Sequence, residues 1–111
     1  RGLAHITGGG LTENIPRILP NTMNAFIDSS SWKTPEIFTW IAREGKVPSD
    51  EMIRTFNCGI GMVIVVSQDT ANMVLNELSN HDQNAQIIGE VIPSTDEESN
   101  VVIGDHMRLF E

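Results

Sequence analysis

The pattern of hydrophobic and polar residues alternates short apolar runs with stretches of helical spacing. Five largely apolar runs predict strands, at residues 3–6, 24–27, 62–66, 86–92 and 101–103. The third run, Met-Val-Ile-Val-Val, has no polar position, which predicts a central strand buried on both faces. Pro93 ends the fourth run, and an acidic turn over 93–100 lets the fifth run pair back as the last strand.

Helices are predicted between these runs. Ile37, Trp40 and Ile41 are spaced as one apolar stripe of a helix. The Thr34-Pro35 pair opens this helix with the threonine as N-cap, and Gly45 stands where a left-handed C-cap residue belongs.

Two further helices follow along the chain. One covers residues 49–56, with Met52, Ile53 and Phe56 on its apolar side. The other is capped by Ser67, and its apolar residues at 71, 74, 75 and 78 form a stripe that we expect to face the sheet. The order of elements predicts an α/β (α+β) fold in which helices cover a mixed β-sheet. At 111 residues the chain is expected to form a single domain.

The segment from His5 to Asn14 joins the first strand to a short helix and contains three consecutive glycines. Glycines at 8–10 allow positive φ and let a ligand approach the backbone amides. A helix that opens at Thr12 or just before it, and ends near Leu19, points free N–H groups into the same space, which suits a phosphate or carboxylate. The alternative is that the glycines only form a tight turn. The segment matches neither G-x-x-x-x-G-K-[ST] nor G-x-G-x-x-G, which argues against a P-loop hydrolase and a standard dinucleotide fold.

Polar residues beside the glycines are candidates for contacting an anion. His5 is a proton shuttle or phosphate partner, or else a core histidine held by hydrogen bonds. Thr7 and Asn14 add a hydroxyl and an amide to the site, or only fix the turn. Arg17 reaches the same ligand or stays solvated. Asn57 presents an amide to a ligand or caps the preceding helix.

Cys58 is the only cysteine, which excludes an internal disulfide and fits a reducing compartment. A thiol nucleophile needs a base, and the nearest histidines, His5 and His81, are distant along the chain. A buried small residue is therefore the preferred interpretation. No spacing of His, Cys and acidic residues indicates a dedicated metal site.

The net charge of −8 is concentrated in the later part of the chain. Residues 1–66 carry six Lys and Arg against six Asp and Glu, whereas residues 67–111 carry one arginine against nine acids. Such a surface argues against nucleic acid and anionic membranes as partners. No apolar run reaches the roughly 18 residues of a membrane-spanning helix and no leader is evident, so we expect a cytoplasmic location.

Several segments together closely resemble the phosphoribosylformylglycinamidine cyclo-ligase family, also called aminoimidazole ribonucleotide synthetase. The resemblance extends in order over residues 2–91. The segments that carry it are residues 4–10, 13–17, 31–32, 35–38 and 52–62.

The resemblance implies ATP-dependent ring closure in purine biosynthesis. In that family, ATP phosphorylates the formyl amide oxygen of formylglycinamidine ribonucleotide, an internal amine closes the imidazole ring, and ADP and phosphate leave. The family enzyme is a two-domain homodimer, and residues 1–111 resemble the later part of its C-terminal domain. Most of the ATP site and the Mg²⁺ ligands are implied to lie in the N-terminal domain. We therefore expect the segment alone to bind no cofactor tightly and to catalyse nothing.

With the resemblance, the glycine segment is expected to hold a phosphate of the substrate or nucleotide at the interdomain cleft. The residues assigned to substrate binding are His5, Thr7, Gly8, Gly9, Gly10, Asn14 and Asn57. Three alternatives stay open: a related enzyme such as formylglycinamidine synthetase or selenophosphate synthetase, a non-catalytic module for a phosphorylated ligand, and a structural interaction domain.

Overall fold

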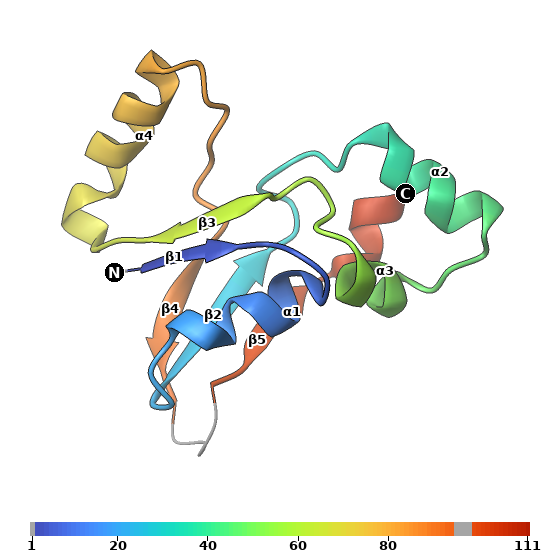
Figure 1. Ribbon diagram of the computed structural model, residues 1–111, viewed down its shortest axis with the longest axis horizontal. Coiled ribbons are helices and arrows are strands. Elements are labelled where there is room, and N and C mark those ends of the chain that lie inside the picture. The colour runs from blue at the N-terminus through green and yellow to red at the C-terminus, as the bar shows by residue number, and fades with distance from the viewer. Residues whose placement is uncertain (1, 95–98) are drawn as a thin grey trace.

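In the computed structural model, which describes residues 2–94 and 99–111, the strands form two sheets (Figure 1). The first pairs β1 (Gly2–His5) antiparallel with β3 (Met62–Val65). In the second, β2 (Met23–Asp28) lies between β4 (Gly89–Pro93), which is antiparallel to it, and β5 (Val101–Gly104), which is parallel. The predicted α/β (α+β) class with a mixed sheet and helices is confirmed. The predicted acidic turn lies partly outside the described residues.

Helices connect the strands at both ends of the molecule. Figure 1 shows α2, α3 and the C-terminal segment gathered at one end, while α4 stands apart at the other. The α-helices are α1 (Gly10–Asn14), α2 (Glu36–Glu44), α3 (Ser49–Thr55) and α4 (Ala71–Asn80). The 3-10 helices are η1 (Pro16–Ile18), η2 (Gln68–Thr70) and η3 (His106–Phe110). Among the described residues, no helix combines the length and apolar character needed to cross a membrane.

The core draws on the inner faces of both sheets together with α1 and α3. Burial alternates along β2, where Ala25 and Ile27 are buried and Phe26 is exposed, as in a strand with one covered face. Both α1 and α3 add long side chains to the same cluster. The largest completely buried side chains are Leu11, Ile15, Met52 and Cys58.

The two-stranded sheet has one buried and one exposed face. Ala4 and Val63 are register partners and are both buried, whereas the paired Leu3 and Ile64 are both exposed. The prediction of a central strand buried on both faces is therefore wrong for residues 62–66. Within the described part of the chain β3 has β1 as its one strand neighbour. A run of β-branched residues indicates which side chains tolerate burial, but the neighbouring elements determine whether burial occurs.

The apolar stripes of α2 and α4 are also less covered than their spacing suggests. None of the residues of α4 is buried, and this helix stands away from both sheets (Figure 1). The prediction that its stripe faces the sheet is therefore wrong. On α2, Ile37 and Trp40 are 56% and 54% exposed. Spacing predicts that these segments are helical, whereas their packing depends on the rest of the fold.

Both predicted caps of α2 differ from those observed. The helix begins at Glu36 with Pro35 as N-cap and no side-chain cap hydrogen bond, so Thr34 does not cap it. Gly45 has φ of −84°, and its N–H still donates to the Ile41 carbonyl at 2.9 Å. The left-handed residue is Lys46, at φ 52°, because the helical hydrogen bonding continues through the glycine.

Candidate functional site

The glycine segment forms a tight connection between β1 and α1. The N–H of Gly10 donates to the Thr7 carbonyl at 3.0 Å and closes the turn. Gly9 and Gly10 have φ of 98° and 63°, a region that side chains strongly disfavour. The prediction that the glycines adopt positive φ is thus confirmed at Gly9 and Gly10.

Gly10 is required by packing as well as by its dihedral angle. A Cβ at this position would lie 1.8 Å from the carbonyl oxygen of Ile53 and 2.9 Å from that of Phe56. These two carbonyls come from the C-terminal end of α3 and the residue after it. The missing side chain therefore lets the start of α1 contact α3 directly, which is a structural role.

Asn14 holds the segment together through its side-chain amide. This residue is 4% exposed. Its Nδ2 donates to the carbonyls of Gly10 at 2.8 Å, Thr7 at 3.2 Å and Gly8 at 3.4 Å. Its Oδ1 accepts from the Thr7 hydroxyl at 3.2 Å and from Arg17 at 3.3 Å. The contacts made by this amide are thus internal and fix the turn.

Gly8 forms the outer part of the segment, and Gly9 beside it is buried. Gly8 is exposed, and a Cβ there would meet no atom within 4 Å. In the part of the chain that the structure describes, the N–H groups of Gly8 and Gly9 donate to no acceptor. The carboxylate of Glu13 lies against Gly9, because a Cβ at Gly9 would fall 2.0 Å from its Oε2. An anion placed beside Gly9 would therefore be repelled by this carboxylate.

The helix after the glycines differs from the prediction. A segment from about Thr12 to Leu19 was expected, whereas α1 begins at Gly10 and the short η1 follows it from Pro16. Pro16 lacks an N–H, so it starts a new helical turn instead of continuing the first one. With five residues, α1 is too short for its dipole to carry an anion site.

His5 and Asn57 lie on the neighbouring strand and turn. His5 is exposed on β1 opposite Met62, so it is not the core histidine that the sequence left open. The N–H of Ile6 donates to the Gly61 carbonyl at 2.9 Å, which brings the two glycine-containing turns side by side. The Oδ1 of Asn57 accepts from the Gly59 N–H at 2.8 Å and thereby shapes its own turn.

Cys58 is buried, as the sequence predicts. It is 1% exposed, and its Sγ lies 3.7 Å from the Met52 carbonyl oxygen. Burial raises the pKa of the Cys58 thiol to about 11, so the nucleophilic thiolate is scarce near neutral pH. Its carbonyl accepts from the Trp32 indole N–H at 3.0 Å, and Gly59 beside it packs against Pro35. This turn is a structural element of the core.

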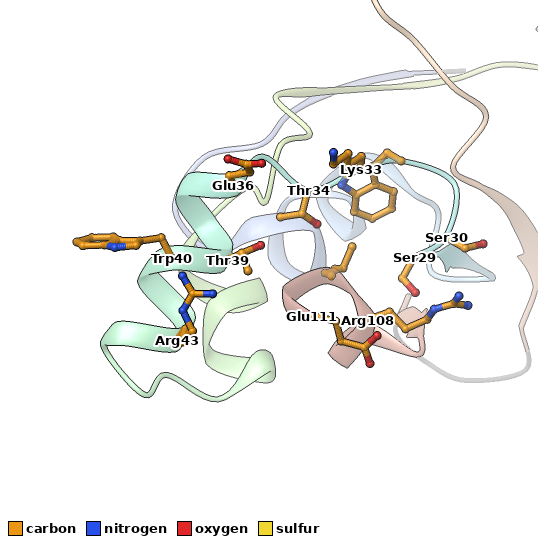
Figure 2. Close-up of a pocket in the computed structure, with 12 residues that line it drawn as sticks. Ser29, Ser30, Lys33, Thr34, Glu36, Thr39, Trp40, Arg43, Arg108 and Glu111 are labelled. Carbon is orange, nitrogen blue, oxygen red and sulfur yellow. The ribbon is translucent and has the colours of Figure 1, made fainter.

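A second concave region, which the sequence did not indicate, lies between α2 and η3. Figure 2 shows basic residues from different elements around it, among them Lys33, Arg43 and Arg108. The sequence carried no signal for it because η3 is short and has no apolar periodicity. Residues 2–94 and 99–111 hold no group of three or more His, Cys, Asp or Glu side chains that could bind a metal ion.

Comparison with known proteins identifies related sequences across nearly the whole chain. A family model described as AIR synthase related protein, C-terminal domain, matches residues 1–102. The phosphoribosylformylglycinamidine cyclo-ligase of Pseudothermotoga lettingae is 51% identical over 102 residues, which are 92% of this chain and 29% of that protein. The chloroplastic phosphoribosylformylglycinamidine cyclo-ligase of Arabidopsis thaliana is 50% identical over 92 residues, 83% of this chain and 24% of that protein.

A longer protein contains a similar segment. The trifunctional purine biosynthetic protein adenosine-3 of Gallus gallus is 48% identical over 111 residues, which are 100% of this chain and 11% of that protein. The chain therefore spans less than a third of the length of each of these relatives.

Proposed function

Because this chain belongs to the family of AIR synthase related proteins, through their C-terminal domain, we propose that it is part of a phosphoribosylformylglycinamidine cyclo-ligase. In the proposed reaction, ATP activates the formyl amide oxygen of formylglycinamidine ribonucleotide and an internal amine closes the ring, with release of ADP and phosphate. The observation that carries the proposal is 50–51% identity to two proteins named as this cyclo-ligase, over 83–92% of the chain.

The proposed enzyme needs more polypeptide than these 111 residues. An N-terminal domain supplies most of the ATP site and the Mg²⁺ ligands, and two copies form a cytoplasmic homodimer. Residues 1–111 alone bind neither cofactor tightly and catalyse nothing. The supporting observation is that the matched segment is 24–29% of the length of the two cyclo-ligases.

Within this proposal, the outer part of the glycine segment contacts the phosphate of the ribonucleotide substrate. Gly8 supports this role, because it is exposed, has open space around it and has an N–H without an acceptor among the described residues. Arg17 is close to the segment, because its guanidinium donates a hydrogen bond to the Asn14 side chain. Glu13 opposes an anion, so its exposed side chain has to rotate away from Gly9 when the substrate binds.

A chimaeric enzyme tests the proposed activity. The 102 matching residues of this chain replace the corresponding segment of the Pseudothermotoga lettingae cyclo-ligase, and the formation of aminoimidazole ribonucleotide and of ADP is measured together. We expect both products in equal amounts, at a rate within about tenfold of the unmodified enzyme. A folded chimaera that binds ATP but forms no imidazole product would refute the assignment and favour a non-catalytic module.

Two substitutions in the same chimaera test the glycine segment. Gly8→Val places a side chain where the ligand is proposed to approach and should raise KM for the ribonucleotide about tenfold, with little change in KM for ATP. Glu13→Gln removes the opposing charge and should lower the same KM. If neither variant changes KM for the ribonucleotide, the segment is a turn and the phosphate binds elsewhere.

A further inference from the structure

The concave region between α2 and η3 is a cleft of about 610 Å³, large enough for a small metabolite. Its walls are the connection after β2, residues of α2 and the C-terminal η3 (Figure 2). It shares no lining residue with the glycine segment or with the Asn57–Gly61 turn. A ligand bound here would therefore be additional to the proposed substrate.

The wall formed by η3 is held by hydrogen bonds at its start and by the burial of Leu109 within it. Ser29, at the end of β2, donates from its hydroxyl to the Asp105 carbonyl at 3.1 Å. The His106 Nδ1 and the Ser49 hydroxyl of α3 are 2.8 Å apart, and Leu109 is buried in the core. Arg108 is thus carried on an ordered turn that faces the cleft.

The cleft collects positive charge on a chain whose net charge is −8. Three of its seven Lys and Arg residues line it: Lys33 after β2, Arg43 on α2 and Arg108 on η3. In the described ranges, neither Lys33 nor Arg108 has an ion pair, whereas Arg43 lies 3.7 Å from the exposed Glu44.

Three acidic groups lie in or beside the same cleft. Glu36 and Glu111 are part of its lining, which leaves one net positive charge. Asp28 lies beside it, and hydrogen bonds from Ser30, with a smaller contribution from Arg108, hold the pKa of this carboxyl below its usual range.

An unpartnered hydroxyl also belongs to this cleft. Thr34 is 8% exposed, and its Oγ1 is the one buried side-chain nitrogen or oxygen in the described residues that has no hydrogen-bond partner. Figure 2 shows this hydroxyl on the side that faces η3. It stands two residues before α2, a helix of nine residues in which the N–H groups of Glu36 and Ile37 have no intrahelical acceptor. Buried polar groups normally have partners, so this hydroxyl keeps a donor and acceptor capacity that the described residues leave unused.

From these observations we propose that the cleft binds the phosphoryl group of a small molecule. A tetrahedral dianion accepts hydrogen bonds from several directions, which matches cations on three separate elements and a hydroxyl between them. The source is either free inorganic phosphate or a phosphate ester, and both present the same dianion.

Tryptophan fluorescence offers a direct measurement, because both tryptophans, Trp32 and Trp40, line this cleft and the chain contains no tyrosine. The 111-residue chain is titrated with inorganic phosphate and, separately, with ribose 5-phosphate, at constant ionic strength held with chloride. We expect a saturable change with either anion. Tighter binding of ribose 5-phosphate identifies an ester as the ligand, and equal binding identifies free phosphate.

Charge-neutral variants connect the signal to the cleft. Arg108→Gln and Lys33→Gln should each weaken binding about tenfold, whereas Lys46→Gln, the same charge change outside the cleft, should alter it less than twofold. Thr34→Val should weaken binding without loss of the folded circular dichroism spectrum.

Gly8→Val should leave the phosphate-dependent change in tryptophan fluorescence unchanged, which separates the cleft from the proposed substrate site. No saturable change, or equal effects of Arg108→Gln and Lys46→Gln, would overturn the proposal.

Discussion

Two regions of the molecule contain apolar residues but differ in how closely those residues are packed. Around Gly10, the short α1 contacts α3 backbone to backbone, and the Asn14 side chain donates to the carbonyls of Thr7, Gly8 and Gly10. From β3 to α4, an apolar stretch contributes Val63 to the core, whereas Ile64 on the other side of the strand is exposed and no residue of the helix is fully buried.

The difference shows that packing follows from small and polar residues as much as from apolar ones. The first region is tightly packed because a glycine lets two backbone segments approach closely and because a buried amide donates hydrogen bonds to backbone carbonyls. The second has a strand with a single strand neighbour in the described chain and a helix away from both sheets. Substitutions should therefore affect stability strongly in the first region and weakly in the second.

The largest effect is expected for Gly10→Ala. Its Cβ would overlap the Ile53 carbonyl oxygen, and the left-handed backbone adds strain, so unfolding free energy should fall by about 3 kcal/mol or more. Urea denaturation measures this. Gly8→Ala is the matched control and should stay within about 0.5 kcal/mol. Equal losses in the two variants would contradict the close contact between α1 and α3.

Asn14→Ala should be the next most harmful change. It removes a buried amide and the hydrogen bonds that this amide donates to three carbonyls of the turn, at a cost of about 2 kcal/mol. Thermal and urea unfolding both report this loss. Asn72→Ala, on the exposed surface of α4, should change stability by less than about 0.5 kcal/mol. An Asn14 variant as stable as the Asn72 variant would show that the amide is dispensable.

A smaller effect is expected from pH through Cys58. Its folded pKa of about 11 lies above the ordinary 9.0, so the folded state holds this proton more tightly than the unfolded state. The resulting stability is complete below pH 9 and is lost as pH rises from 9 to 11. Comparing the unfolding free energy of the native chain and Cys58→Ala across this range isolates the effect. Parallel pH profiles would contradict burial of the thiol.

The smallest effect is expected on α4. Leu75 is only partly buried, so Leu75→Ala should lower the free energy of unfolding by about 0.5 kcal/mol. Measured in the same urea series, a loss above about 2 kcal/mol would mean that α4 packs against the fold more closely than its exposure indicates.

Local signals in the sequence predicted most elements correctly. The strand runs at 24–27 and 101–103, the helix over 49–56 and the burial of Cys58 are confirmed. These features depend on propensity and on periodicity within a few residues. The exposure of β3 and α4 could not be predicted, since it depends on which other elements lie beside them.

In the candidate site, too, local backbone geometry could be predicted from the sequence, whereas contacts with distant parts of the chain could not. The glycine run predicted left-handed backbone, which the structure has at Gly9 and Gly10. It could not predict that Gly10 faces a carbonyl more than 40 positions away, or that Glu13 covers Gly9. The alternative in which Asn14 fixes the turn fits its contacts, and substrate binding by the segment stays a prediction. The cleft beside α2 depends on η3, whose five residues carry no periodic pattern.

The order of strands around β2 has a consequence for how the chain folds. Both neighbours of β2 come from much later in the sequence: the Ala25 N–H donates to the Asn100 carbonyl, and Phe26 pairs with Glu90 and Val102. Contacts of such long sequence separation form slowly, because a large loop must close before they stabilise anything. During synthesis, one edge of β2 stays unpaired until β4 at Gly89 has been made and the other until β5 at Val101 has been made, and unpaired strand edges favour aggregation in incompletely folded chains.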